Sequence, residues 1–532
     1  MQTRKTTFKT PHVENKRADV KNLLYYFHGL CFSTFASVSI YMTYQDAQIF
    51  AAPNSIWRSV IFSILFYVVF IVILYIITKD HETTGIAGTF MVLGMLYIWR
   101  TFILITIAIA LAWLLLGIVG KKFSLIHFHI SASAIALAIA AYHGVQYLGY
   151  INGLEWGEKD VMASPLPIES ASVSDENKPD IYYIILDGYG GANMLRSLHG
   201  FDNSKFIADL ESRGFIVTPE SKANYPRTIL SLGSSLNAQY LDNLSSTMGN
   251  TYLWWPLTAT LSDSQVRNFL EGQGYQTIVI ASGWDFTSIA DADVYKKPYP
   301  IFLNKFEELF IQNTNLSVLS FLSNFGISFP SYPTHRTTVT YQFDQLTRLA
   351  DLPSPKFVFV HIISPHAPFI FDAEGNPVTP DYPFTFADDR YFLFPASKYR
   401  QGYLAQLLYV NNQVIRVVDS ILSSSRKPPV IILQGDHGPG VFIDYRSSEN
   451  SCLYERFSIL NAFYFPGVAP ESVPADISPV NTFRLILNNY FSTNLELLPN
   501  RYLFSPSYKL YQFEDISDKV DQPCKIPDSD KP

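Results

Sequence analysis

Long uncharged runs dominate the first 150 residues of the chain. A membrane-spanning helix needs roughly 20 mostly apolar residues. Five stretches come close to or exceed this length, namely Leu23–Thr43, Ser59–Thr78, Thr83–Trp99, Thr101–Gly120 and Phe123–Leu154. A single helix over Thr83–Gly120 would be more than about 50 Å long, so two helices with a tight connection near Arg100 are expected there. The pattern therefore predicts an N-terminal α-helical transmembrane bundle of about five spans, residues 23–154, that lies in a lipid bilayer.

Basic residues near the ends of these runs predict the orientation. Lys and Arg accumulate on the cytoplasmic side of membrane helices. Five spans place nine of them on one side and leave only Arg58 and Arg100 on the other; the nine are Arg4, Lys5, Lys9, Lys16, Arg17, Lys21, Lys79, Lys121 and Lys122. The tail 1–22 is therefore expected in the cytoplasm, and everything after the fifth span outside it. The length of the first run and the four that follow exclude a cleaved signal peptide.

A different pattern begins after residue 179. Residues 155–179 are rich in Pro, Ser and acidic residues without periodicity, which predicts a linker. Short buried-strand patterns then alternate with helical ones, as in a mostly parallel sheet with helices on both faces. The expected strands are Asp180–Leu186, Gln276–Ala281, Lys356–Ile363, Pro429–Leu433 and Leu460–Phe465, and the expected helices include Phe206–Arg213 and Tyr399–Ser424. We expect a catalytic α/β domain over 180–510 and a C-terminal tail over 511–532.

Composition narrows the possible partners. The net charge of −7 and the absence of a basic groove exclude nucleic acid. Cys31 lies in an apolar run and is expected inside the membrane. Cys452 and Cys524 could pair if their domain faces an oxidising compartment, but the sequence leaves both states open.

Polar residues follow three of the expected strands. The first strand runs into Asp187, the third into Ser364-Pro365-His366, and the fourth through Gln434-Gly435 into Asp436-His437. In open α/β sheets, ligands bind beyond the carboxyl ends of the strands. Carboxylates and imidazoles gathered there are the ligands of a divalent metal site. Taken singly, Asp187 could be an ordinary turn residue and His366 a loop cap, whereas an Asp-His pair after a buried strand has no packing role.

The nucleophile is expected where a helix begins. In Asn224-Tyr225-Pro226-Arg227-Thr228, the proline lies near the first helical position and a helix-compatible run continues to Tyr240. Thr228 then lies in the first turn, where free N–H groups and the helix dipole favour anions. A divalent ion would lower the pKa of its hydroxyl enough to make it a nucleophile. Ser231 and Ser234 are weaker candidates, and Thr228 could also serve only as a helix-start hydrogen-bonding residue.

These residues carry a family resemblance. An Asp after the first strand, a Thr about forty residues later, a distal His-Ala-Pro-Phe and a late Gly-Asp-His-Gly are similar to the sulfatase-like, alkaline-phosphatase superfamily. The preceding spans make the chain resemble its membrane-embedded branch, which contains lipoteichoic acid synthases and lipid A phosphoethanolamine transferases. The resemblance implies an alkaline-phosphatase-like α/β fold, with Asp187, Thr228, Asp436 and His437 as metal ligands and Thr228 as nucleophile. It implies that His366 contacts the substrate or protonates the leaving group.

The chain also departs from the family pattern. Glu is usual in the membrane-embedded transferases where this chain has Asp187, and none of the three cysteines lies in the C/S-x-P-x-R context of formylglycine sulfatases. Two-metal relatives take a histidine from near the C-terminus, but no histidine follows His437. The expected cofactor is therefore one divalent ion, and ligand type alone does not choose among Mn, Mg, Ca and Zn.

Together these features predict a monomeric integral enzyme of the cell or inner membrane with an extracytoplasmic catalytic domain. The leading interpretation is a metal-dependent phospho-group transferase acting through Thr228 on a lipid-borne or envelope glycan substrate. The expected substrate-binding residues are Asn224, Trp284 and His366. The alternatives are a sulfatase-like hydrolase of phosphate or sulfate esters that uses water as acceptor, and a non-catalytic receptor or scaffold that retains the fold.

Overall fold

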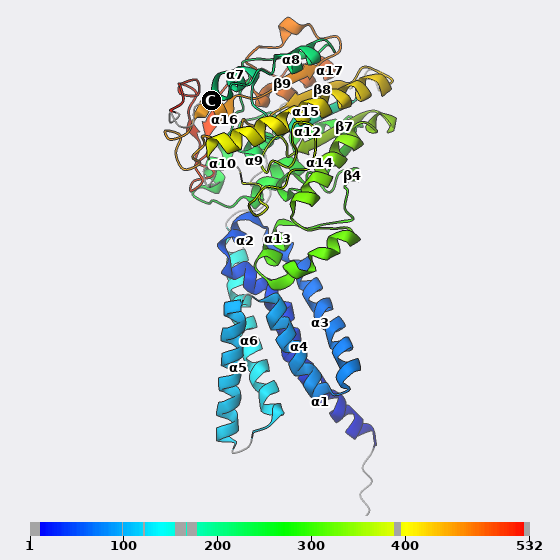
Figure 1. Cartoon of the computed structure of the whole chain (residues 1–532), viewed down its shortest axis with the longest axis vertical. Helices are drawn as coiled ribbons and strands as arrows, with labels where there is room; N and C mark the ends of the chain where they lie inside the picture. Colours follow the sequence, from blue (N-terminus) through cyan, green and yellow to red (C-terminus); the bar gives the residue numbers. More distant parts are fainter. Residues whose placement is uncertain are drawn as a thin grey trace, which may run out of the picture. The chain divides into compact units, whose positions relative to one another are not determined.

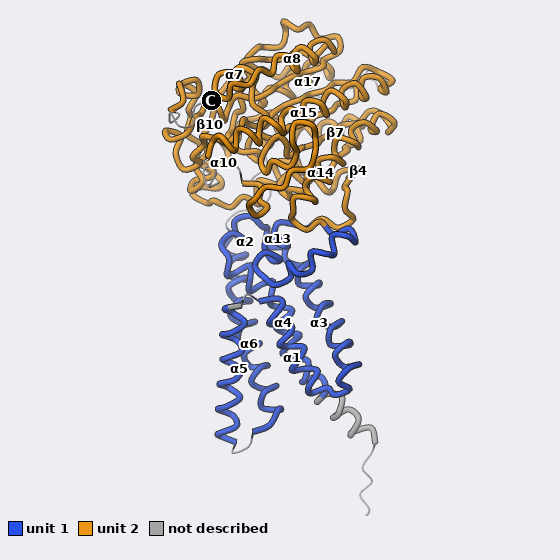
Figure 2. Tube along the Cα trace, viewed as in Figure 1, with its two compact units in different colours: residues 1–155, 303–327 blue, residues 156–302, 328–532 orange. Residues whose placement is uncertain are grey.

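The computed structural model describes residues 11–97, 99–120, 123–154, 166, 178–387 and 395–525. The chain forms two compact units (Figure 2). Unit 1 contains residues 1–155 together with 303–327, and unit 2 contains residues 156–302 and 328–532. The expected linker 155–179 lies almost entirely outside the described residues.

Unit 1 is a bundle of long apolar helices (Figure 1). Among the described residues, four stretches of helix are long and apolar enough to cross a membrane, Asn22–Thr43, Pro53–Thr78, Arg100–Val119 and Leu125–Asn152. The elements of this unit are α1 (Pro11–Thr43), α2 (Gln45–Phe50), η1 (Pro53–Ile56), α3 (Trp57–Thr78), α4 (His81–Leu96), α5 (Trp99–Val119), α6 (Leu125–Asn152), α13 (Lys305–Gln312) and η6 (Asn315–Phe325). The protein is thus an integral membrane protein by the length and composition of these helices.

Helix α4 is why the expected count of five spans is not confirmed. It has 16 residues, so it is about 24 Å long at 1.5 Å per residue, shorter than the hydrocarbon core. It begins at His81, where the Asp80 side chain accepts a hydrogen bond from the Thr83 backbone, and it ends at Leu96. It packs against α1 and α3.

Hydrogen bonds between polar side chains connect three helices of this bundle. His28 of α1 lies 2.5 Å from Thr89 Oγ1 of α4 through Nδ1, and 2.8 Å from His129 Nδ1 of α6 through Nε2. The three side chains are buried. Such contacts hold polar groups away from lipid and fix neighbouring helices against each other.

Unit 2 is built on a seven-stranded sheet with the order β2-β9-β8-β1-β7-β3-β4. Strands β8, β1, β7, β3 and β4 are parallel, and β9 is antiparallel to both β8 and β2. The strands of this sheet are β1 (Ile181–Leu186), β2 (Ile216–Val217), β3 (Gln276–Ile280), β4 (Val294–Lys296), β7 (Lys356–Ile362), β8 (Val430–Gln434) and β9 (Asn461–Tyr464). Two small sheets pair β5 (Ile301–Phe302) with β6 (Ile327–Ser328) and β10 (Leu503–Phe504) with β11 (Glu514–Asp515).

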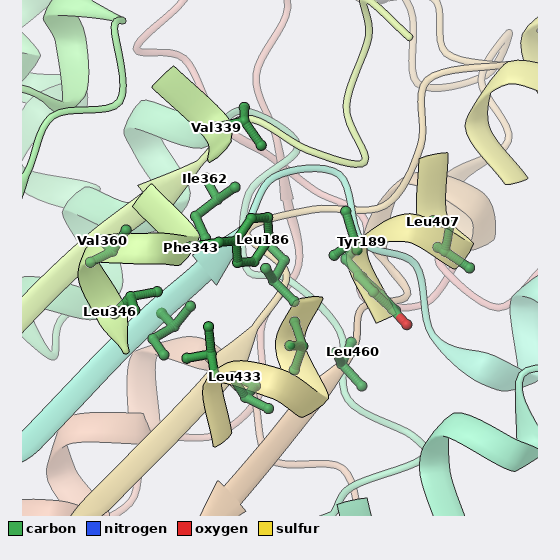
Figure 3. Close-up of a cluster of buried hydrophobic side chains, with 14 of the residues drawn as sticks. Leu186, Tyr189, Val339, Phe343, Leu346, Val360, Ile362, Leu407, Leu433 and Leu460 are labelled. Atoms are coloured by element: carbon green, nitrogen blue, oxygen red, sulfur yellow. The ribbon is translucent and has the colours of Figure 1, made fainter. Parts of the chain in front are cut away.

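Helices cover both faces of the sheet, because side chains of a strand point alternately to opposite faces. Leu186, Ile362 and Leu433 from three strands pack with Phe343 of α14 and Leu407 of α15 (Figure 3). On the opposite face, the Tyr183 ring packs against Phe483 of α17 and its hydroxyl hydrogen-bonds Ser235 of α9. The helices of unit 2 are α7 (Ala192–His199), α8 (Ser204–Glu211), α9 (Thr228–Asn237), α10 (Asp242–Met248), α11 (Ala259–Ser262), α12 (Gln265–Gly272), α14 (Tyr332–Leu346), α15 (Ala396–Ser424), α16 (Leu453–Phe457) and α17 (Thr482–Phe491).

The α/β interpretation of this half of the chain is confirmed. Each of the five expected strands corresponds to an observed one, and the expected helices correspond to α8 and α15. The last of the five strands, β9, runs antiparallel to its neighbour β8, so the sheet is mostly rather than wholly parallel.

Residues 511–525, which the sequence assigned to a tail, pack into unit 2. Glu514 and Asp515 form β11, and the side chains of Ile516 and Val520 are buried in a cluster with Phe457. A disulfide joins Cys524 to Cys452, which is the N-cap residue of α16. The disulfide therefore closes a covalent loop that contains α16 and the chain from it to Cys524.

We expect reduction of this disulfide to destabilise unit 2. The bridge joins cysteines separated by 72 residues, and closing a loop of that length restricts the unfolded chain by about 4 kcal/mol in the chain-entropy model. The matched variants are Cys452→Ser with Cys524→Ser, compared with Cys31→Ser, which removes the free cysteine. Thermal unfolding should show a clearly lower Tm for the double variant and for the reduced protein; an unchanged Tm would contradict a formed bridge.

Candidate functional site

Three neighbouring strands bring the expected site residues together. Strand β1 lies between β8 and β7, and the three are parallel, so their carboxyl ends meet at the same edge of the sheet. Asp187 follows β1, and Asp436 with His437 follows β8. The spacing along the sequence is large, yet parallel pairing makes these residues neighbours.

Asp187, Asp436 and His437 form a group that can hold a metal ion. One ligand atom from each lies within 4.8 Å of the other two, and all three side chains are buried. His437 Nε2 lies 3.3 Å from Asp436 Oδ2 and 3.6 Å from Asp187 Oδ1. Neither of these two carboxylate oxygens has a hydrogen-bond partner. Buried carboxylate oxygens are normally hydrogen-bonded, so a pair of them facing one imidazole nitrogen fits a bound cation.

The hydrogen bonds of His437 show which of its two ring nitrogens carries the hydrogen. Nδ1 lies 3.0 Å from the Gly438 carbonyl oxygen, which can only accept, so Nδ1 carries the hydrogen and Nε2 carries a lone pair. The other oxygen of Asp436, Oδ1, accepts from the backbone N–H groups of Gly188 and His437, each at 3.0 Å. These bonds fix the orientation of both side chains, as is usual around metal ligands.

Thr228 completes the group from a helix N-terminus. Helix α9 begins at Thr228, with Arg227 as its N-cap residue. The Thr228 hydroxyl oxygen lies 3.1 Å from His437 Nε2, and its side chain is buried. The first turn of α9 leaves backbone N–H groups available at this position, which favours negative charge there.

His361 is a neighbour of the site that sequence reasoning missed. It lies on β7, is buried, and its Nε2 is 3.0 Å from Asp187 Oδ2. Its Nδ1 is 2.9 Å from the Thr287 hydroxyl. A histidine inside an otherwise apolar strand pattern, Lys-Phe-Val-Phe-Val-His-Ile, was the available signal.

The imidazoles around Asp187 keep it ionised. Burial raises the pKa of this carboxyl, but His366, His361 and His437 outweigh burial and hold the pKa well below its usual range. A carboxylate that remains charged over the whole physiological range is the form that binds a cation.

His366 lies at the rim of the same site. Its ring centroid is 6.1 Å from that of His437, and its Nδ1 is 2.5 Å from the Ala367 carbonyl. The buried His335 of α14 lies nearby; burial first, and then His366, lower its pKa to about 3. His335 is therefore neutral at physiological pH, and sequence reasoning did not single it out.

Arginines supply positive charge beside Thr228. Arg456 Nη2 lies 3.0 Å from His437 Nε2, and its Nε and Nη1 donate to the carbonyls of Pro226 and Gly438. The Arg227 guanidinium lies over the Tyr445 ring, 4.0 Å from its centroid. Neither arginine was a candidate in the sequence analysis. Arg456 lies in α16, and only the fold of the chain after β8 brings it to the site.

Two expected substrate-binding residues have different surroundings. The Asn224 side chain is buried and is used within the protein: its amide donates to Tyr240, Ser478 and Arg501, and its oxygen accepts from Val480. Its assignment to the substrate stays a prediction. Trp284, by contrast, is partly exposed and its ring centroid lies 6.1 Å from that of His361.

Comparison with known proteins gives one family and several distant structural likenesses. The C-terminal periplasmic domain of EcEptC from Escherichia coli, in complex with Zn, is 14% identical, with a TM-score of 0.43 over 68% of this chain and 98% of that chain. The integral membrane lipooligosaccharide phosphoethanolamine transferase A of Neisseria meningitidis is 11% identical, with a TM-score of 0.40 over 77% of this chain and 69% of that chain. Likenesses this distant assign no activity, and no curated protein matches this chain significantly.

The family model for sulfatases, in contrast, matches residues 179–483. This range contains all seven strands of the main sheet and every residue of the group around Thr228. The match extends over more than half of the sequence, so the chain belongs to the sulfatase family and is a sulfatase-like transferase or ester hydrolase.

Proposed function

We propose that this protein is a membrane-anchored, metal-dependent enzyme that transfers a phospho-group outside the cytoplasm, with Thr228 as the nucleophile. One observation carries the proposal: the Thr228 hydroxyl, at the N-terminus of α9, lies 3.1 Å from the lone-pair nitrogen of His437. That nitrogen also faces the carboxylate oxygens of Asp187 and Asp436.

Four side chains are the proposed metal ligands: Asp187, Thr228, Asp436 and His437. Two carboxylates, one hydroxyl and one imidazole suit Mn, Mg, Ca or Zn, and the expected stoichiometry is one ion. When bound, such an ion supplies positive charge that lowers the pKa of a coordinated hydroxyl and stabilises the charge that develops on the substrate. The two carboxylate oxygens without hydrogen-bond partners support this assignment.

The proposed reaction is a displacement at phosphorus. The Thr228 hydroxyl gives its proton to water, its oxygen forms a bond to phosphorus, and the bond from phosphorus to the leaving alcohol breaks. His366 is positioned at the rim of the site to give a proton to the leaving oxygen. The result is a phospho-threonine. In a second displacement an acceptor hydroxyl gives its proton to His366 and bonds to phosphorus, the bond from phosphorus to the Thr228 oxygen breaks, and that oxygen takes a proton from water.

Positive charge beside Thr228 supports an anionic substrate. Arg456 is buried and lies next to His437, and Arg227 directly precedes the nucleophile. Guanidinium groups bind phosphate and sulfate oxygens well because of their planar set of donors. The N-terminus of α9 adds backbone N–H groups for the same charge.

The final acceptor separates two versions of the proposal. The membrane helices of unit 1 support a lipid-borne donor or acceptor, hence a transferase. Membership of the sulfatase family supports the second version, an ester hydrolase in which water takes the group. The two versions use the same residues, and product analysis with and without an added hydroxyl acceptor distinguishes them.

The proposed orientation places unit 2 outside the cytoplasm. The ends of α1 and α6 and the beginning of α3 lie together in unit 1, since Tyr150 of α6 bonds the Gln48 carbonyl and Tyr147 bonds the Pro53 carbonyl. If the N-terminal tail is cytoplasmic and successive helices alternate in direction, with α4 counted as one of five passes, then α6 ends on the outer side. The Cys452–Cys524 disulfide supports this orientation because disulfides persist in oxidising compartments.

Thr228→Ala is expected to abolish turnover while leaving the fold in place. Losing the hydroxyl removes the covalent step, worth several powers of ten in rate, but costs only about 0.5–2 kcal/mol in stability, as for other residues at helix starts. Thr228→Ser should retain measurable activity. Ser231→Ala, one turn further along the same helix, is the matched control and should be mild in both assays. A folded Thr228→Ala protein with near wild-type turnover would end the nucleophile assignment.

Removing the metal is expected to abolish turnover and lower the Tm. A ligand at 100 times its Kd stabilises the folded state by about 2.7 kcal/mol, so adding Mn, Mg, Ca or Zn to chelator-treated protein should raise the Tm. The Asp436→Asn variant should bind no ion and should show no rise in Tm when metal is added. The control is Asp419→Asn, which changes a surface carboxylate paired with Arg213 and should keep both the ion and the rise in Tm. Elemental analysis should give one ion per chain; two tightly held ions would refute the single site.

Labelling in intact cells tests the orientation. In a Cys31→Ser background, a membrane-impermeant maleimide should react with Tyr508→Cys, since Tyr508 is exposed in unit 2. A cysteine introduced in the N-terminal tail, Thr6→Cys, should react only after the membrane is permeabilised. The reverse pattern would place the catalytic unit in the cytoplasm and would contradict the proposal.

A further inference from the structure

A segment within the sequence of the catalytic domain belongs structurally to the membrane unit. Residues 303–327 group with the helices of unit 1, although the residues before and after them belong to unit 2 (Figure 2). The segment begins after β5 and ends in β6, and these two strands form a two-stranded sheet. Residues 303–327 therefore form an insertion that consists of α13 and η6, and the two strands at its ends pair with each other.

Specific polar contacts hold the insertion to the membrane helices. Asn304 caps α13 together with Glu307, and its amide donates to the Ser55 carbonyl at 3.0 Å. Glu307 pairs with Arg58 of α3 at 3.0 Å. At the start of η6, the Asn315 amide donates to the Gly94 carbonyl of α4 at 2.6 Å. These contacts all lie at the end of the bundle where α3 begins and α4 ends.

One apolar face of the insertion is buried among the membrane helices. Phe306, Phe310 and Leu316 belong to the same buried cluster as Tyr41 of α1 and Leu93 of α4. The rings of Phe306 and Tyr41 have centroids 5.9 Å apart. This face fixes the insertion to unit 1 through packing as well as through hydrogen bonds.

A second apolar face of the insertion is open. Val318, Phe321 and Phe325 of η6 are 64%, 54% and 76% exposed. η6 is a 3-10 helix. Val318 and Phe321 are one turn of such a helix apart and therefore lie on the same side of it, and Phe325 is its last residue. Residues 309–327 contain no Asp, Glu, Lys or Arg. An uncharged surface with two exposed phenylalanines is unfavourable in water, since nothing on it compensates the apolar contact with solvent.

We propose that η6 lies in the outer interface of the bilayer, with Val318, Phe321 and Phe325 in contact with lipid. The bilayer is the proposed occupant because the insertion is held to helices long and apolar enough to cross a membrane: Glu307 of α13 pairs with Arg58 of α3, and the neighbouring Trp57 and Ile61 are 55% and 57% exposed. Trp57 at this depth matches the aromatic belt of membrane proteins. The insertion is therefore a second membrane anchor of the catalytic domain, in addition to the chain that follows α6.

The chemistry of the face identifies the part of the lipid that it contacts. Interfacial helices that bind anionic headgroups carry Lys and Arg on their polar side, whereas the exposed residues of η6 between its apolar side chains are Ser and Asn. The contact is therefore with the acyl chains and the glycerol region. It should not depend on lipid charge or on ionic strength.

Fluorescence of the full-length protein in phosphatidylcholine nanodiscs tests this contact. Phe325→Cys and, separately, Val318→Cys in a Cys31→Ser background are labelled with a polarity-sensitive fluorophore. Lipids with a nitroxide on the acyl chain near the glycerol should quench both labels as strongly as a label at Ile61→Cys, with emission shifted to the blue. A label at Tyr508→Cys, on a side chain of similar exposure (59%) in unit 2, is the water-exposed reference.

Three results would overturn the proposal. Labels at both η6 positions that emit as the Tyr508 label does, without quenching, would place the face in water. Emission shifted to the blue without lipid quenching would place it against a protein, such as a second copy of the chain. Quenching that appears only with phosphatidylglycerol and disappears at high salt would indicate headgroup attraction rather than apolar contact.

Discussion

The rest of the site depends on two buried carboxylates at the ends of adjacent strands, because their negative charges have to be compensated. Asp187 and Asp436 are buried, and each turns one oxygen without a hydrogen-bond partner toward the same imidazole nitrogen. Two negative charges in a buried site repel each other and are costly to desolvate. The sheet can place them together only if positive charge and donors are provided nearby, and the surrounding chain supplies both.

The compensation comes from elements far apart in the sequence. His361 Nε2 lies within hydrogen-bond distance of Asp187 Oδ2, and the backbone N–H of Gly188 donates to Asp436 Oδ1. Arg456 comes from α16 and contacts His437, while α9 directs its N-terminus to the same point. A bound divalent ion would neutralise what these groups leave uncompensated. The site thus combines two buried carboxylates with the positive charge of Arg456 and, when it is bound, of the ion, and this positive charge would attract an anionic substrate.

The sequence predicted the parts of this arrangement that follow from local pattern. Buried strands read as continuous apolar runs, and the polar residues directly after them, Asp187 and Asp436-His437, therefore stood out. Thr228 was predicted because Pro226 and a helical pattern define a helix start. The sequence could not predict Arg456, whose position depends on how the chain returns after β8, and it gave only a weak signal for His361. Likewise the sequence analysis did not separate residues 303–327 from the catalytic domain expected over 180–510, because periodicity does not say against which surface a helix packs.

The insertion between β5 and β6 also determines where the protein can be divided. A fragment that begins after α6 would still contain Phe306, Phe310 and Leu316, whose neighbours in the intact protein are side chains of the membrane helices. Without those helices this face would meet water, and the fragment would be prone to aggregate although its sheet is complete. Because β5 and β6 already pair, a short turn in place of the intervening residues would give a water-soluble catalytic unit. A single cut in the sequence would not.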